Sequence, residues 1–233
     1  LSGLVRKVAA LSDGLEEAVE ERLKSERMKV ELVTNVSHDI KTPLTSIISY
    51  VELLKQADGL PEDLKDYVKI LAQKSERLRE IVQDVFEISR AASGQLPLKL
   101  ERLDLGKLLR QTLADKKDII EDSSFQLRVS IPEEETMILA DGQRMYRVFA
   151  NLLENALKYS LEGSRIFLDL KKEEGGAEVR LRNTSKEELK TGKDFTERFV
   201  RGDESRTDGG SGLGLSIAKS FTQACGGTFR VET

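Results

Sequence analysis

Apolar residues in the N-terminal part of the chain recur at the spacing of a helix. Two stretches, one from residue 25 and one from about Pro61, carry them at steps of three and four, which predicts two long amphipathic helices. A short loop with Asp58 and Gly59 separates them, and Pro61 suits the first turn of the second helix. The apolar positions are Val33, Val36, Ile40, Leu44, Ile47, Val51 and Leu54, then Leu64, Val68, Leu71, Leu78, Val82 and Val85.

The predicted helices would pack as an antiparallel hairpin over residues 25–93. Each helix has a continuous apolar seam, and one hairpin cannot cover both seams. We therefore expect a homodimer in which two hairpins form a four-helix bundle. Residues 1–24 carry a narrower apolar stripe and are predicted to be a connector helix.

Beyond a linker at 94–102, residues 103–233 mix helical and strand periodicity. Helices are expected at 104–122, 142–159 and 213–224, and strands at 125–131, 137–140, 165–171 and 179–183. Gly175 and Gly176 predict a tight turn between the last two of these strands. A final short strand is expected after Gly226 and Gly227. The predicted fold class is α+β, with an α/β sandwich that has its helices on one face of a sheet.

Composition narrows the possible functions. The net charge of −4, from 37 basic and 41 acidic residues, argues against nucleic acid as a partner. His38 and Cys225 are the single histidine and the single cysteine, which excludes an intrachain disulfide and a zinc site of the Cys/His type. No apolar run reaches the 18 residues of a membrane helix. Because the chain begins with Leu1 and not Met, we expect a fragment of a longer protein.

His38 is the first candidate for chemistry. It lies two residues from both Val36 and Ile40, so it points away from the apolar seam. An exposed neutral imidazole is a good nucleophile near neutral pH, and Asp39 could orient it or accept its other proton. Pro43 should bend the helix nearby, because it cannot donate to the carbonyl four residues earlier.

A second candidate site combines a polar helix stripe with a glycine-rich loop. Asn151, Asn155 and Lys158 step by four and three, so they share one face of their helix. Amide oxygens suit Mg²⁺ and a lysine suits phosphate. Residues 210–215 read Gly-Ser-Gly-Leu-Gly-Leu before the last helix, where glycines and a helix N-terminus favour an anion.

These motifs together resemble those of one protein family, and they extend over essentially the whole chain. Residues 37–44, Ser-His-Asp-Ile-Lys-Thr-Pro-Leu, resemble the phosphoacceptor box of sensor histidine kinases of two-component systems. Residues 151–159, 195–201 and 210–215 resemble the N box, the F box and the second glycine box of that family, in the same order. The resemblance implies a dimerisation and histidine-phosphotransfer hairpin followed by an ATP-binding domain of the gyrase/histidine-kinase type.

For the hairpin, the resemblance implies two reactions. His38 would take the γ-phosphoryl group of ATP and pass it to an aspartate in the receiver domain of a response regulator. Asp39 and Thr42 would serve a phosphatase reaction on that regulator, with Thr42 positioning water. The chain would be the cytoplasmic portion of a sensor that is anchored in the membrane by an N-terminal segment absent from this sequence.

For the second domain, the resemblance implies a site for ATP and Mg²⁺. Asn155 would be the Mg²⁺ ligand with Asn151 in support, and Tyr159 would lie near the nucleotide. Arg201 and Arg206 would contact the γ-phosphate from a lid segment. The other implied nucleotide-binding residues are Lys158, Asn183, Gly210, Gly212, Leu213 and Gly214.

The first glycine box departs from the family pattern. The family has Asp-x-Gly-x-Gly with its Asp at the adenine amine, whereas residues 182–185 here read Arg-Asn-Thr-Ser. Asn183 would take the place of the Asp, facing the interior with Val179 and Leu181. Two alternatives to a kinase follow: a catalytically silent pseudokinase that acts as a dimeric scaffold, or another ATPase of the same fold, such as a gyrase-like or mismatch-repair enzyme. The His38 box counts against the second.

Overall fold

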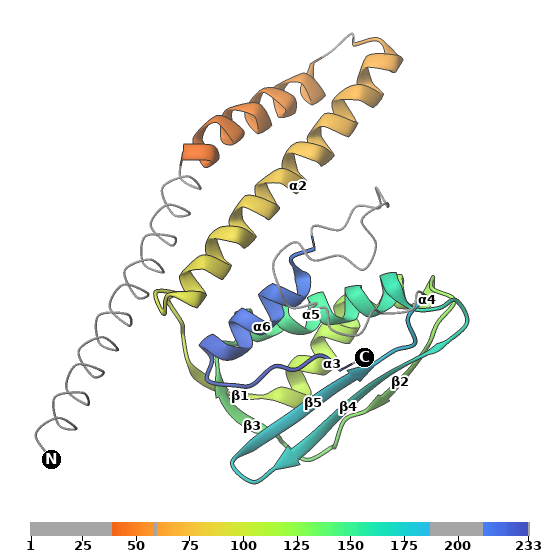
Figure 1. Cartoon of the computed structure of the whole chain (residues 1–233). Coiled ribbons are helices and arrows are strands. Elements are labelled where there is room, and N and C mark those ends of the chain that lie inside the picture. The colour runs from red at the N-terminus through yellow and green to blue at the C-terminus, as the bar shows by residue number, and fades with distance from the viewer. Residues whose placement is uncertain (1–38, 58–59, 187–211, 233) are drawn as a thin grey trace, which may run out of the picture. The chain divides into compact units, whose positions relative to one another are not determined.

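The structure is a computed structural model that describes residues 39–57, 60–186 and 212–232 (Figure 1). The chain divides into two compact units, Leu1–Gln95 and Leu96–Thr233. The predictions made for the connector helix, for His38 and for the segment that includes Arg201, Arg206 and Gly210 lie outside the described residues. Each unit is described by itself below.

The first unit contains the predicted helical hairpin. Residues 39–56 are helical, and α2 spans Glu62–Ala92. Pro61 is the N-cap of α2, with a ψ of 146°, and so lies just before the first turn and not in it. Gly94 ends α2 in the left-handed region with a φ of 69°, where a residue without a Cβ is favoured.

The seam of this hairpin is only partly covered. Leu44, Val51 and Val68 are buried. Six other seam positions remain between 40% and 51% exposed: Ile40, Ile47, Leu54, Leu64, Leu71 and Leu78. The hairpin therefore leaves a long apolar surface along both helices.

The described residues of the second unit form two sheets. Strand β1 (Glu101–Asp104) pairs antiparallel with β3 (Met137–Ala140). In the other sheet the order is β2-β4-β5, with β2 (Gln126–Ser130) parallel to β4 (Arg165–Glu173) and β4 antiparallel to β5 (Gly176–Arg182). The β4–β5 hairpin confirms the turn predicted from the glycine pair, because Gly175 takes a φ of 82°.

Helices cover one face of the three-stranded sheet, as predicted (Figure 1). These are α3 (Leu105–Asp115), the short α4 (Lys117–Glu121), α5 (Gly142–Tyr159) and α6 (Gly214–Ala224). Strand β4 supplies the centre of the core, with alternate residues facing the helices and at most 4% exposed: Ile166, Leu168 and Leu170.

Three local predictions are wrong. Strand β1 begins at Glu101, inside the segment predicted to be a linker at 94–102. The single helix expected at 104–122 breaks at Lys116, whose φ of −104° and ψ of 10° are not helical and separate α3 from α4. Residues 227–232 contain no strand. A strand needs a neighbour for its backbone groups, and among the described residues this segment forms no ladder with β5.

Asp104 fixes the start of α3. Its carboxylate, in a residue that is 9% exposed, accepts hydrogen bonds from the backbone N–H of Gly106 at 3.0 Å and of Thr136 at 3.2 Å. Burial opposes ionisation, but the backbone hydrogen bonds together with the nearby Lys107 ammonium outweigh it and hold the pKa of Asp104 below its usual value.

We expect Asp104→Ala to lower the free energy of unfolding by about 1–2 kcal/mol at pH 7, the usual cost of losing an N-cap. A depressed pKa contributes stability above the unfolded-state pKa, and that contribution is lost as the pH falls through the folded-state value. The difference between Asp104→Ala and the wild type should therefore shrink below about pH 4. Urea unfolding at pH 7 and pH 3 measures both effects, with the exposed Glu133→Ala as control. An equal difference at both pH values would contradict this account.

Candidate functional site

Helix α5 carries the polar stripe predicted from the sequence. Its N-cap, Asp141, accepts from the backbone N–H of Arg144 at 3.1 Å and of Lys99 at 2.9 Å, which fixes where the helix begins. From that start Asn151, Asn155 and Lys158 fall on one face. The two asparagines are half-buried and Lys158 is exposed.

Asn155 lies directly against the beginning of α6. A Cβ built on Gly214 would lie 3.1 Å from Nδ2 and 3.6 Å from Oδ1 of Asn155. The missing side chain at Gly214 therefore allows the amide group to approach the first turn of α6. This contact brings together the polar stripe and the glycine-rich string, two motifs that are far apart in the sequence.

The backbone conformation of Gly212 and the burial of Leu213 fix the residues that precede α6. Gly212 has a φ of 68°, a left-handed value that favours glycine. Leu213 is fully buried, and its carbonyl accepts a hydrogen bond from the hydroxyl of Ser216 at 2.8 Å. The first N–H groups of a helix have no partners within the helix and favour an anion. The amide of Asn155 lies at the same place and can supply an oxygen to a hard cation, so these residues fit Mg²⁺ together with phosphate.

The other end of α5 is joined to the segment that follows β5. The N–H of Lys186 donates to the carbonyl of Tyr159 at 2.9 Å, and the N–H of Leu161 donates to the carbonyl of Thr184 at 2.8 Å. Tyr159 is 47% exposed, and the Lys158 ammonium lies 5.5 Å from the centroid of its ring. The segment around Asn183 thus runs beside the C-terminal end of α5.

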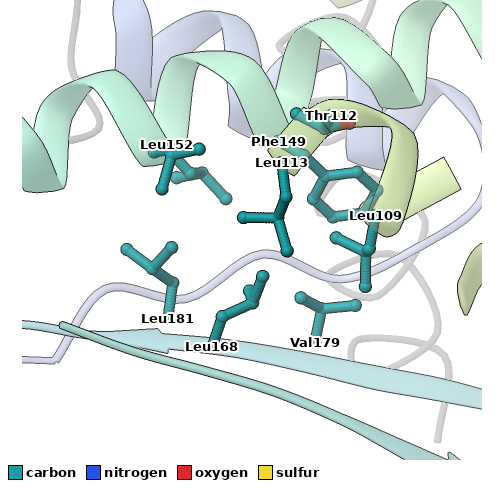
Figure 2. A pocket seen from close by; sticks show the side chains of 9 residues that line it. Leu109, Thr112, Leu113, Phe149, Leu152, Leu168, Val179 and Leu181 are labelled. Carbon is teal, nitrogen blue, oxygen red and sulfur yellow. The ribbon is translucent and has the colours of Figure 1, made fainter. Parts of the chain in front are cut away.

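The inward orientation expected for Asn183 is wrong. Val179 and Leu181 do point inward, where they line an apolar pocket beside Leu152 (Figure 2). Asn183 is exposed, because β5 ends at Arg182 and the alternation of the strand does not continue. The remaining lining residues of the pocket are Leu109, Thr112, Leu113, Phe149, Leu153 and Leu168.

The described part of the phosphoacceptor box begins immediately after His38. Asp39 and Thr42 are both exposed, and the chain stays helical through Pro43. The hydroxyl of Ser46 donates to the carbonyl of Thr42 at 3.3 Å. These two candidate side chains are therefore open to solvent on the first helix of the hairpin.

Cys225 has a structural place at the end of α6. It is half-buried at the C-cap of α6. Burial raises the pKa of its thiol, and this outweighs the hydrogen bond from the backbone N–H of Asp141. The thiol is accordingly kept in its protonated, poorly nucleophilic form at neutral pH.

Sequence reasoning missed three contacts that hold α5 in place. The guanidinium groups of Arg144 and Arg147 lie 5.1 and 5.4 Å from the ring centroid of the fully buried Phe221, and so join α5 to α6. An ion pair joins Lys116 to Glu154 on α5. The two arginines extend the stripe of Asn151 by steps of three and four, which is the signal that could have revealed them.

Comparison with known families agrees with this geometry. Residues 28–94 match the family described as the His Kinase A (phospho-acceptor) domain. Residues 140–233 match the family of histidine kinase-, DNA gyrase B- and HSP90-like ATPases. The chain belongs to the sensor histidine kinases of two-component systems.

Individual sensor kinases resemble the chain along most of its length. The sensor protein VanSC of Enterococcus gallinarum is 34% identical over 215 residues, covering 90% of this chain and 58% of the relative. The sensor protein VanS of Enterococcus faecium is 33% identical over 234 residues, covering 98% and 60%. The chain thus spans about three fifths of these relatives.

A solved structure supports the same fold. The crystal structure of full-length ShkA in complex with AMPPNP matches with a TM-score of 0.72 and 25% identity, over 84% of this chain and 41% of that one.

In the chain described here, none of the described helices combines the length and the apolar character needed to cross a membrane. The described residues of this chain contain no cluster of three His, Cys, Asp or Glu side chains that could hold a metal ion.

Proposed function

We propose that this chain is the catalytic part of an ATP-dependent protein-histidine kinase that phosphorylates itself on His38. An imidazole nitrogen attacks the γ-phosphorus of ATP, a P–N bond forms, and the P–O bond to the leaving ADP breaks. The phosphoryl group then passes to an aspartate in the receiver domain of a response regulator. A neutral imidazole is suited to this role near neutral pH.

The approach of Asn155 to Gly214 is the observation that carries the proposal. It joins a Mg²⁺-type ligand to a helix N-terminus, the two groups that a metal-bound triphosphate needs. Asn151 and Lys158 extend the site along α5, and Gly212 and Leu213 shape the approach to α6. In this proposal Gly210, Arg201 and Arg206 complete the phosphate contacts. The AMPPNP complex of ShkA supports ATP as the ligand.

A single-turnover reaction with γ-labelled ATP tests the proposal against its alternatives. A kinase transfers the label to His38. A pseudokinase or scaffold binds nucleotide or partner without turnover. Another ATPase of this fold releases labelled phosphate and leaves the protein unlabelled. Each class therefore gives a different distribution of the label.

We further propose that the chain removes the phosphoryl group from its response regulator. Exposed Asp39 and Thr42 on the first helix of the hairpin support this, because a hydroxyl and a carboxylate can orient water for attack on a phosphoryl group. Loss of label from a phosphorylated receiver domain measures the activity.

We also propose that the chain lies on the cytoplasmic side of a membrane-anchored sensor. Fractionation of cells that contain the full-length protein would test this location.

We expect the chain to be a homodimer because its hairpin leaves Ile47 and Leu71 about half exposed. Burying an aliphatic side chain contributes about 1.5–3 kcal/mol. The variant Ile47→Glu with Leu71→Glu should therefore weaken the dimer by at least about 100-fold. Light scattering at micromolar concentration should give a dimer for the wild type and for Lys69→Glu, an exposed control on α2. A monomeric wild type would contradict the four-helix bundle.

Asn183 is exposed, and we propose that it still contacts the base of a bound nucleotide and weakens discrimination between ATP and GTP. A carboxylate accepts hydrogen bonds only, which suits the exocyclic amine of adenine, whereas an amide presents a donor and an acceptor. Asn183→Asp should increase the preference for ATP by on the order of 1 kcal/mol, the net worth of one hydrogen bond. Competition binding with both nucleotides measures the preference, and an unchanged ratio would place Asn183 away from the base.

A further inference from the structure

A carboxylate lies beside Asn151, Asn155 and Lys158, the side chains of α5 that are proposed to bind Mg²⁺ and phosphate. Glu154 lies between Asn151 and Asn155 in the sequence, on the edge of the same face of α5. Side chains three or four residues apart on a helix are about 5–6 Å from one another. An uncompensated negative charge at Glu154 would therefore repel the phosphates bound by its neighbours. It would also compete for Lys158, its partner at the favourable i,i+4 spacing.

Lys116 compensates this charge. Its ammonium lies 2.5 Å from Oε1 of Glu154, and its side chain is 22% exposed, less than that of Glu154 at 52%. The hydrogen bond to Glu154 raises the pKa of Lys116 and outweighs the effect of burial, so the lysine stays charged. The pair is more sheltered than the exposed pairs on the hairpin, such as Lys65 with Glu62.

Lys116 lies at the break between α3 and α4. It is the non-helical residue that separates the two helices, and its side chain pairs with Glu154 on α5. Its neighbour Asp115 accepts a hydrogen bond from Tyr146, which is also on α5. Two polar contacts thus connect the end of α3 to the stripe helix.

We propose that Lys116 is a positioning residue for nucleotide binding, which neutralises Glu154 and holds it away from the phosphate-binding side chains of α5. This inference rests on the proposed nucleotide site. It assigns a binding role to a residue that lies in none of the motifs. The proposed effect is electrostatic. Lys116 strengthens binding of the charged phosphates and does not change binding of the base or the ribose.

Binding of MgATP and of adenosine to the full chain tests the role. Lys116→Met should weaken MgATP binding about fivefold at low salt, because it leaves Glu154 as an uncompensated charge that repels the net charge of about −2 on MgATP across roughly 8 Å of water. The loss should shrink at physiological salt, because exposed charges are screened. Adenosine binding should stay within about twofold. Lys116→Arg should behave as wild type, and Glu154→Gln added to Lys116→Met should restore MgATP binding.

The matched control is Lys117→Met, which removes the next lysine, an exposed residue paired with Glu121 at 3.5 Å. It should leave both affinities unchanged. Equal weakening of MgATP and adenosine by Lys116→Met, or no restoration by Glu154→Gln, would overturn the electrostatic role. A wild-type chain that binds neither MgATP nor adenosine would overturn the nucleotide site itself, and this inference with it.

Discussion

His38→Gln should abolish acid-labile, alkali-stable phosphorylation of the chain, a loss of at least about 100-fold, because an amide cannot act as the nucleophile. The same variant should bind MgATP with unchanged affinity. The proposed acceptor belongs to the first unit, Leu1–Gln95, and the proposed nucleotide-binding residues belong to the second, Leu96–Thr233. Labelling with γ-labelled ATP and a separate nucleotide titration measure the two properties.

Thr42→Ala is the matched control, four residues further along the sequence. It should retain autophosphorylation and slow dephosphorylation of the response regulator by about tenfold or more, because orienting water matters only for hydrolysis. Acid-labile label retained by His38→Gln would refute the assignment of the acceptor. Equal loss of both activities in Thr42→Ala would indicate a damaged helix and not a lost water contact.

Gly214→Ala should weaken MgATP binding by about tenfold and lower autophosphorylation in proportion. The new methyl group would lie 3.1 Å from Nδ2 of Asn155, so the amide must move by a few tenths of an ångström. Mg²⁺ demands near-ideal octahedral geometry, so a small displacement of a ligand is costly. Binding of ATP with and without Mg²⁺ measures the effect, which should be larger in the presence of the metal.

The fold itself should tolerate this substitution. Alanine is favoured over glycine in a helix by up to about 1 kcal/mol, which offsets the local crowding at the start of α6. Gly176→Ala is the control, since a Cβ at Gly176 meets nothing within 4 Å. Unchanged MgATP affinity in Gly214→Ala would show that Asn155 does not ligate the metal. Loss of the folded state would instead make Gly214 a packing residue.

The sequence by itself determined the elements with a strong local period. The helical hairpin, the eighteen-residue α5 with Asn151, Asn155 and Lys158 on one face, and the β4–β5 hairpin at Gly175 were all predicted. Periodicity and turn chemistry are properties of neighbouring residues, so they can be read without knowledge of the fold. The family motifs were equally local, because each is a short uninterrupted string.

Tertiary structure alone decided how distant residues meet. The approach of Asn155 to Gly214, the ion pair of Lys116 with Glu154 and the missing ladder at 227–232 depend on packing between elements. The break at Lys116 could not be predicted from periodicity, because the apolar spacing continues across it. Asn183 is exposed and lies just beyond the end of β5 at Arg182. Hydrogen bonds and contacts between separate segments have no counterpart in the local sequence, and they fixed the geometry of the candidate site.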